Sequence, residues 1–184
     1  MAGRPDDRDN GRMLIRREGA ADLPGIRDVH AAAFAGQSAP GRTPVEVGLV
    51  DALRADSGWL PALSMVAERD GHVIGHVVCT RGDVAGIPAL GLGPLGVLPA
   101  HQGTGVGGAL MHAVLGAADA LGEPLVALLG HTGYYPRFGF RPSTEHAVTA
   151  PDPSWGAHFQ VRTLTAYTLD VRGPFTYAKP FDDL

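Results

Sequence analysis

A cluster of glycines between residues 102 and 108 is the part of this sequence best suited to chemistry. The segment reads Gln-Gly-Thr-Gly-Val-Gly-Gly and follows an apolar run that ends at Leu98. After it, apolar residues recur at three- and four-residue spacing, which predicts a helix over 105–121. The first amides of a helix have no partner within the helix, and the helix dipole adds positive charge there. The sequence therefore predicts a turn that holds phosphate at this helix N-terminus.

Two common phosphate-binding motifs fit this turn poorly. A P-loop needs a lysine directly after its last glycine, and the only lysine of the chain is Lys179. Gly103, Gly105 and Gly108 match the dinucleotide pattern G-x-G-x-x-G, in which an acidic residue ends the next strand. Here the acidic residue, Glu123, precedes the next apolar run instead. A nicotinamide-binding oxidoreductase therefore stays a remote alternative.

A third pattern, Q-x-x-G-x-G, is met by Gln102, Gly105 and Gly107, and Gly133–Phe140 further on reads GYYPRFGF. Together these motifs resemble the acyl-CoA loop and the closing Y-x-x-x-G-F of the GNAT superfamily of N-acetyltransferases. The resemblance spans roughly residues 60 to 142. It implies an α/β, GNAT-like acyl-CoA N-acyltransferase fold, with a mixed central sheet whose strands splay and which helices flank. It also implies acetyl-CoA as cosubstrate, and we expect no metal.

The resemblance also assigns the residues that hold the cofactor. In the family, the strand before the loop bulges, and its free main-chain groups pair with the pantetheine amides. Gly96 lies within such a strand, where glycine often marks a bulge, although it could merely relieve crowding under a helix. Thr104 could either bind phosphate or cap the helix. The expected cofactor-binding residues are Leu95, Gly96, Val97, Gln102, Gly103, Thr104, Gly105, Val106, Gly107 and Gly108.

Tyr135 is the expected catalytic residue, because the family's general acid lies four residues before the glycine of G-F, here Gly139. A phenol has a pKa of about 10 and stays protonated at neutral pH, so it can donate a proton to a departing thiolate. Tyr134 is the alternative acid, and both tyrosines could instead simply pack the short helix. The family often has an asparagine before this helix, and this chain has none there.

The general base and the acceptor are not identified by the sequence. Glu46 and His131 are the leading candidates for the base, directly or through water, ahead of His72, His76 and Glu68. The eight histidines are scattered without metal-ligand spacing. Residues 34–61 and 141–184 are expected to form the acceptor pocket. Their aromatic residues are Phe34, Trp59, Trp155, Phe159 and Tyr167.

Length and composition fit one globular domain. The chain has 184 residues and a net charge of −4, which argues against nucleic acid as a partner. No apolar run is long enough to span a bilayer, so no membrane association is expected. The single cysteine, Cys79, fits a reducing cytoplasm. Residues 1–11 are expected to form a flexible tail, and residues 12–184 a single GNAT-like acetyltransferase domain.

Periodicity and turn residues predict the order of elements that must position the loop. Asp22 is the expected N-cap of the first helix, with Pro24 in its first turn. Asp70-Gly71 predicts a hairpin. The expected strands are 13–17, 63–69, 72–81, 90–98, 125–130, 160–164 and 166–171; the expected helices are 22–34, 44–54, 105–121 and a short one near 132–138.

The predicted function is N-acetylation: direct transfer of an acetyl group from acetyl-CoA to a primary amine of a small molecule or peptide. The alternative is a non-catalytic acyl-CoA-binding module that senses or regulates. A C-terminal strand could also pair across a homodimer.

Overall fold

The computed structural model describes residues 12–39 and 41–183, so the predicted tail over 1–11 lies outside the described residues. Its nine strands belong to one sheet, in the order β1-β2-β3-β4-β5-β8-β6, with β9 joining β3 and β7. The strands are β1 (Leu14–Arg17), β2 (Ser64–Arg69), β3 (His72–Val84), β4 (Ile87–Val97), β5 (Leu125–Leu129), β6 (Arg141–Pro142), β7 (Val148–Thr149), β8 (Phe159–Thr163) and β9 (Gly173–Thr176). Pairings are antiparallel except those of β4 with β5 and β7 with β9. The expected mixed α/β sheet is confirmed.

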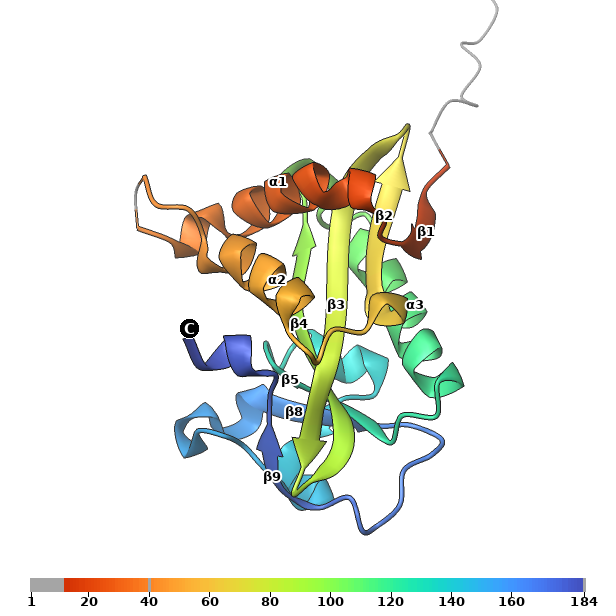
Figure 1. Ribbon diagram of the computed structural model, residues 1–184, viewed down its shortest axis with the longest axis vertical. Helices are drawn as coiled ribbons and strands as arrows, with labels where there is room; N and C mark the ends of the chain where they lie inside the picture. Colours follow the sequence, from red (N-terminus) through yellow and green to blue (C-terminus); the bar gives the residue numbers. More distant parts are fainter. Residues whose placement is uncertain (1–11, 40, 184) are drawn as a thin grey trace, which may run out of the picture.

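Three α-helices cover the sheet: α1 (Leu23–Phe34), α2 (Val45–Ala55) and α3 (Val106–Ala120). In Figure 1, α1 and α2 lie on one side of β3 and β4, and α3 lies on the other. Alternation along the strands builds this arrangement, because successive side chains point to opposite faces. Val66 and Val78 pack with α1 and α2, whereas Val77 and Cys79 pack in the core that α3 covers. No described helix is long and apolar enough to cross a membrane.

The strand expected over 166–171 is absent, and this prediction was wrong. Tyr167 N–H donates to Leu164, and Val171 N–H donates to Thr168, so the segment runs in turns. Asp119, at the end of α3, accepts hydrogen bonds from the amide and hydroxyl of Thr165 and so draws the chain away from β8. The next segment forms β9, which pairs with the far end of β3.

Asp22 lies at the N-cap position of α1, and Pro24 lies in the first turn, as expected, but the side chain of Asp22 does not cap the helix. Its carboxylate accepts from Arg16 and from the amide of Gly19 instead. The charged guanidinium is the stronger partner, and its hydrogen bonds lower the pKa of Asp22.

Candidate active site

The sheet opens between β4 and β5. These parallel strands pair only at Leu90–Val126 and Gly91–Ala127, although β4 continues to Val97. The other edge of β5 pairs with β8 along the whole length of β5. From residue 92 onward, the edge of β4 that faces β5 therefore has no strand partner among the described residues. This is the splay expected from the sequence, and it leads directly to the glycine loop.

The bulge of β4 lies three residues before the position predicted for it. Val77 pairs with Leu95 and Cys79 with Leu92, so Gly93 and Pro94 together face the single residue Val78. Gly96 is regular strand, and a Cβ there would lie 2.9 Å from Nδ1 of His30 and 3.2 Å from Val29. The glycine at 96 is thus explained by the close approach of α1, which was the alternative explanation.

Backbone direction decides which groups of β4 face the gap. Leu98 N–H donates to Ile74 of β3 at 2.9 Å, and main-chain groups of successive strand residues alternate in direction. Gly96 therefore also faces β3, while Leu95 and Val97 face the gap. The carbonyl of Val97 accepts from the Gln102 side chain at 3.0 Å. Gln102 thereby ties the loop to the strand.

The loop itself is exposed and built for backbone contacts. Gly103 has φ +73° and Gly105, the N-cap of α3, has φ +92°, so both occupy the left-handed region that favours glycine. A Cβ would meet nothing within 4 Å at either residue, which leaves the space above the loop open. The Thr104 hydroxyl donates to the His101 carbonyl at 2.7 Å, and it does not cap α3. The amides of the first turn of α3 can therefore meet an anion.

The two adjacent tyrosines reach different places. The Tyr134 hydroxyl lies against the first turn of α3, 2.9 Å from where a Cβ of Gly107 would be. The ring of Tyr135 fills the space beside Gly130, at the end of β5. Burial raises the pKa of Tyr135 to about 12, and the neighbouring Tyr134 adds to that rise. Burial also raises the pKa of Tyr134. Tyr135 is thus a protonated phenol beside the opening of the sheet, whereas Tyr134 contacts the first turn of α3.

A third tyrosine, Tyr177, was missed by the sequence analysis. Its ring occupies the space beside Gly91, where β4 and β5 still pair. It packs against Phe175 and Phe181, with ring centroids 4.7 and 4.8 Å apart. Burial raises its pKa, and Tyr135 adds to the rise. No local pattern marks this residue, because it reaches β4 only through the long-range docking of β9.

The expected pocket aromatics are mostly part of the core. Trp155, Phe159 and Tyr167 join the cluster around Phe175, and Trp59 packs on the buried cluster that includes Leu53 and Val78. Phe34 stacks on His30, with ring centroids 5.9 Å apart.

The candidate bases lie apart from one another. Glu46 lines a hollow of about 430 Å³ at the start of α2, together with Gln37, Ser38, Ala39, Arg42, Thr43 and Val45. His131 is exposed after β5, where its carbonyl accepts from Tyr134 and Tyr135. Glu68 pairs with Arg16, and His76 is fully buried. Within the described part of the chain, no group of three or more potential ligands could hold a metal ion.

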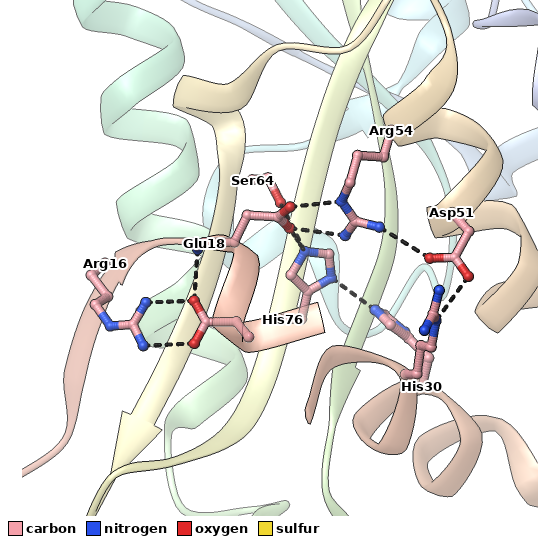
Figure 2. A network of polar contacts seen from close by, with 10 residues as sticks. Arg16, Glu18, His30, Asp51, Arg54, Ser64 and His76 are labelled. Atoms are coloured by element: carbon pink, nitrogen blue, oxygen red, sulfur yellow. Dashed lines mark hydrogen bonds and ion pairs between the residues drawn. The ribbon is translucent and has the colours of Figure 1, made fainter. Parts of the chain in front are cut away.

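A buried polar chain crosses the sheet beneath α1 (Figure 2), and only its member His76 was considered from the sequence. Glu18 accepts from Arg54 at 2.8 Å and from the Ser64 hydroxyl at 2.5 Å. His76 Nε2 lies 2.9 Å from Ser64 Oγ, and His76 Nδ1 lies 2.8 Å from His30 Nε2. Burial by itself raises the pKa of Glu18, but hydrogen bonds from His76, Arg54 and Ser64 outweigh it and hold that pKa at about 2.

Donor and acceptor requirements fix both histidine tautomers. The ionised carboxylate of Glu18 can only accept hydrogen bonds, so the Ser64 hydroxyl donates its one proton to Glu18. Ser64 Oγ must therefore accept a hydrogen bond from His76 Nε2–H. His76 Nδ1 therefore accepts from His30 Nε2–H. His30 Nδ1 is left as a buried, unprotonated nitrogen with no described partner, next to Gly96. Burial, together with smaller contributions from the neighbouring His76 and from the charge of Arg54, lowers the pKa of His30 to about 3, so the ring is neutral.

Comparisons with known proteins agree with this geometry. The family model of the acetyltransferase (GNAT) domain matches residues 61–142. The uncharacterized N-acetyltransferase YjhQ of Escherichia coli K12 is 34% identical over 168 residues, covering 87% of this chain and 89% of that protein. The chain belongs to the GNAT family. It is therefore an acyltransferase.

Solved GNAT structures share the whole architecture. The GNAT family N-acetyltransferase YhbS from Escherichia coli, in complex with CoA, is 31% identical and has a TM-score of 0.84. That match covers 99% of this chain and 96% of YhbS. A GNAT family acetyltransferase from Brucella melitensis, in complex with acetyl-CoA, is 35% identical with a TM-score of 0.75, covering 94% of this chain and all of the other. The predicted family and GNAT fold are confirmed.

Proposed function

We propose that this GNAT protein transfers an acetyl group from acetyl-CoA to a primary amine of a small molecule or peptide by direct attack. The observation that carries the proposal is the opening between β4 and β5, whose unpaired edge leads through the short 3₁₀ helix Pro99–His101 and the glycine loop to the N-terminus of α3. A flexible thioester with a phosphate end matches this combination of a strand edge and an anion site. Two similar proteins are described in complex with CoA and acetyl-CoA.

Different residues would bind different parts of the cofactor. Main-chain groups of Leu95 and Val97 would pair with the pantetheine arm, while Gly96 contributes close packing rather than a contact. The amides of Val106, Gly107 and Gly108 would meet the pyrophosphate, above the open space at Gly103 and Gly105. Gln102 holds the loop on Val97, and Thr104 holds it on His101.

Direct transfer requires one bond exchange and two proton movements. The amine nitrogen bonds to the thioester carbon, the carbon–sulfur bond breaks, and the sulfur leaves with the electron pair. Tyr135 would give its phenolic proton to that sulfur, since its pKa of about 12 keeps it protonated beside the opening. Gap-facing amides of β4 would stabilise the oxyanion. The amine proton passes to water or to a base, for which Glu46 and His131 remain candidates.

The cellular setting is part of the same proposal. A lone, fully buried cysteine fits the reducing cytoplasm, where CoA thioesters are at hand. A homodimer paired through a C-terminal strand remains a hypothesis, to be checked by light scattering at several protein concentrations.

Isothermal titration of the protein with acetyl-CoA and with NADH is the first test. We expect acetyl-CoA to bind, NADH not to bind, and Gly105→Trp to abolish acetyl-CoA binding by filling the open space above the loop. A screen of primary amines with thiol detection then reports turnover. Absence of acetyl-CoA binding would refute the proposal, and binding without CoA release for any amine would favour a sensor.

The role of Tyr135 is tested on the first amine that turns over. Tyr135→Phe should lower kcat by about 10²- to 10⁴-fold, the usual contribution of a general acid, with little change in the Kd for acetyl-CoA. Steady-state kinetics and titration measure the two quantities separately. A comparable loss of kcat in Tyr134→Phe, with Tyr135→Phe active, would move the acid to Tyr134.

A further inference from the structure

The phosphate loop has no permanently charged side chain of its own. Between His101 and Gly108, the side chains are an imidazole, an amide, a hydroxyl, a valine and glycines. CoA carries a pyrophosphate and a 3′-phosphate, and the chain as a whole has a net charge of −4. Helix amides and the dipole contribute only about half a positive charge. A polyanion bound here therefore calls for a cation from another element.

The short 3₁₀ helix η5 (Tyr135–Phe138) lies beside the first turns of α3 and offers that cation. Phe138 meets the exposed His112 edge-on, with ring centroids 5.3 Å apart, and its ring lies 4.0 Å from where a Cβ of Gly108 would be. One residue before η5, the Tyr134 hydroxyl reaches Gly107. The guanidinium carbon of Arg137 lies 4.7 Å from the centroid of the Tyr134 ring. Arg137 is thus joined to the loop through a single aromatic side chain.

The guanidinium of Arg137 is held in place yet keeps its charge available. Its Nε donates to the Tyr134 carbonyl at 2.9 Å, and one terminal nitrogen donates to the Gly133 carbonyl at 3.3 Å. The other terminal nitrogen has no hydrogen bond within the described residues. Arg16, Arg54 and Arg81 each pair with a carboxylate, whereas no described carboxylate pairs with the exposed Arg137. An oriented arginine without a counter-ion is a suitable phosphate ligand.

We propose that Arg137, with the Tyr134 hydroxyl, binds a phosphate group of CoA and supplies the charge that the glycine loop lacks. The proposal rests on the proposed function, because it assigns a further ligand to the same cofactor. Tyr134 would donate its hydroxyl proton to a phosphate oxygen at the α3 N-terminus, and the free nitrogen of Arg137 would reach the same or the neighbouring phosphate. Charge-assisted contacts of this kind favour CoA over uncharged thioesters of the same acyl group.

Titration of CoA and of 3′-dephospho-CoA into the wild-type protein and its variants tests this role. Arg137→Gln should weaken CoA binding about tenfold at low salt, the scale of one charged hydrogen bond. The loss should shrink as ionic strength rises above about 0.1 M, because exposed charges are screened. Arg137→Lys should recover part of the affinity, and Tyr134→Phe, which keeps the ring, should weaken binding about threefold.

The two ligands show which phosphate Arg137 meets. An equal loss for CoA and dephospho-CoA in Arg137→Gln identifies the pyrophosphate, and a loss confined to CoA identifies the 3′-phosphate. Arg172→Gln is the matched control: it removes one exposed arginine near the far end of β3, where β9 pairs with Val84. Gly75, toward the other end of β3, packs on Val106 in the first turn of α3. The length of β3 between Gly75 and Val84 is about 30 Å, so Arg172 lies far from the glycine loop. The CoA affinity of Arg172→Gln should match that of the wild type.

The outcomes separate this inference from the proposed function. Wild-type protein that fails to bind CoA would refute both. Wild-type binding with unchanged affinity in Arg137→Gln, or with an equal loss in Arg172→Gln, would overturn the role of Arg137 alone. Because Arg137 is exposed, the thermal unfolding midpoint of the Arg137→Gln protein should stay within about 2 °C of the wild-type value, as is usual for surface substitutions.

Discussion

The strand β4 has contrasting surroundings. Toward β5 and the glycine loop, it offers main-chain groups, exposed glycines and no fixed charge, whereas beneath α1 it meets a buried chain of ionised and neutral side chains. The first region depends on backbone conformation, and the second on mutual satisfaction of donors and acceptors. A substitution on the loop side should therefore change ligand affinity with little effect on stability, and a substitution in the buried chain should do the reverse.

Glu18→Ala should give the largest effect on stability. It leaves Arg54, Ser64 and His76 without their shared acceptor, and loss of one partner of a buried charged network costs about 3–5 kcal/mol. Urea denaturation measures this loss. Titration of the folded variant with CoA should give a Kd within about twofold of wild type, as for distant sites with no shared partners.

Glu123→Ala is the matched control for that experiment. It removes another buried carboxylate, one that pairs with Arg81 at 2.5 Å, away from both α1 and the loop. A loss of stability in Glu18→Ala well below about 1 kcal/mol, the usual effect of one point mutation, would contradict the importance of the buried chain.

Acid should destabilise the protein through the same chain. His30 has its pKa lowered to about 3, and that of His76 is also lowered, both mainly by burial. In the unfolded chain, both histidines bind a proton below their ordinary pKa of about 6.5, whereas in the folded chain they stay neutral at that pH. Stability is therefore complete above about pH 6.5 and should fall by about 2–4 kcal/mol between pH 7 and pH 5.

Glu18 extends the acid loss to lower pH. Its folded pKa of about 2 lies below the ordinary value, so its contribution is present above about pH 4.3 and disappears toward pH 2. Urea denaturation across this range measures the slope, and His30→Phe should make the upper part shallower. An unchanged slope in His30→Phe would show that other groups cause the acid loss.

Gly96→Ala probes the point where the two regions meet, with a smaller expected effect. The new Cβ would press on His30 and Val29, and overpacking of this kind costs about 1–3 kcal/mol. Because β4 can yield only toward the gap, CoA affinity should fall as well. Gly116→Ala is the control, since a Cβ there meets nothing within 4 Å and alanine stabilises a helix by about 0.5–1 kcal/mol. A Gly96→Ala protein as stable as wild type would contradict the tight packing of α1.

The contrast also explains what the sequence could predict. The loop, its helix and the tyrosine motif are runs of neighbouring residues, so their spacing could predict the fold, which is confirmed, and a candidate cofactor site. The buried chain joins residues 46 and 58 positions apart, and nothing near Glu18 or His30 marks them as partners. Tyr177 and β9 were missed for the same reason. The bulge lies at Gly93 and Pro94, and the prediction at Gly96 was wrong, because the position of a bulge depends on the register with the partner strand. No single segment of sequence encodes that register.

The pairing of β9 with β3 bears on the order in which the chain acquires its structure. β3 and β4 are joined by a two-residue turn at Ala85 and Gly86, so their hairpin closes at little entropic cost. Phe175 pairs with Val84, and the chain between these two residues includes α3 and β5, so this contact has a large sequence separation and a high entropic cost. We therefore expect the β3–β4 hairpin to form before β9 docks on β3. Tyr177, carried on that late segment, reaches the base of the opening only when β9 has docked.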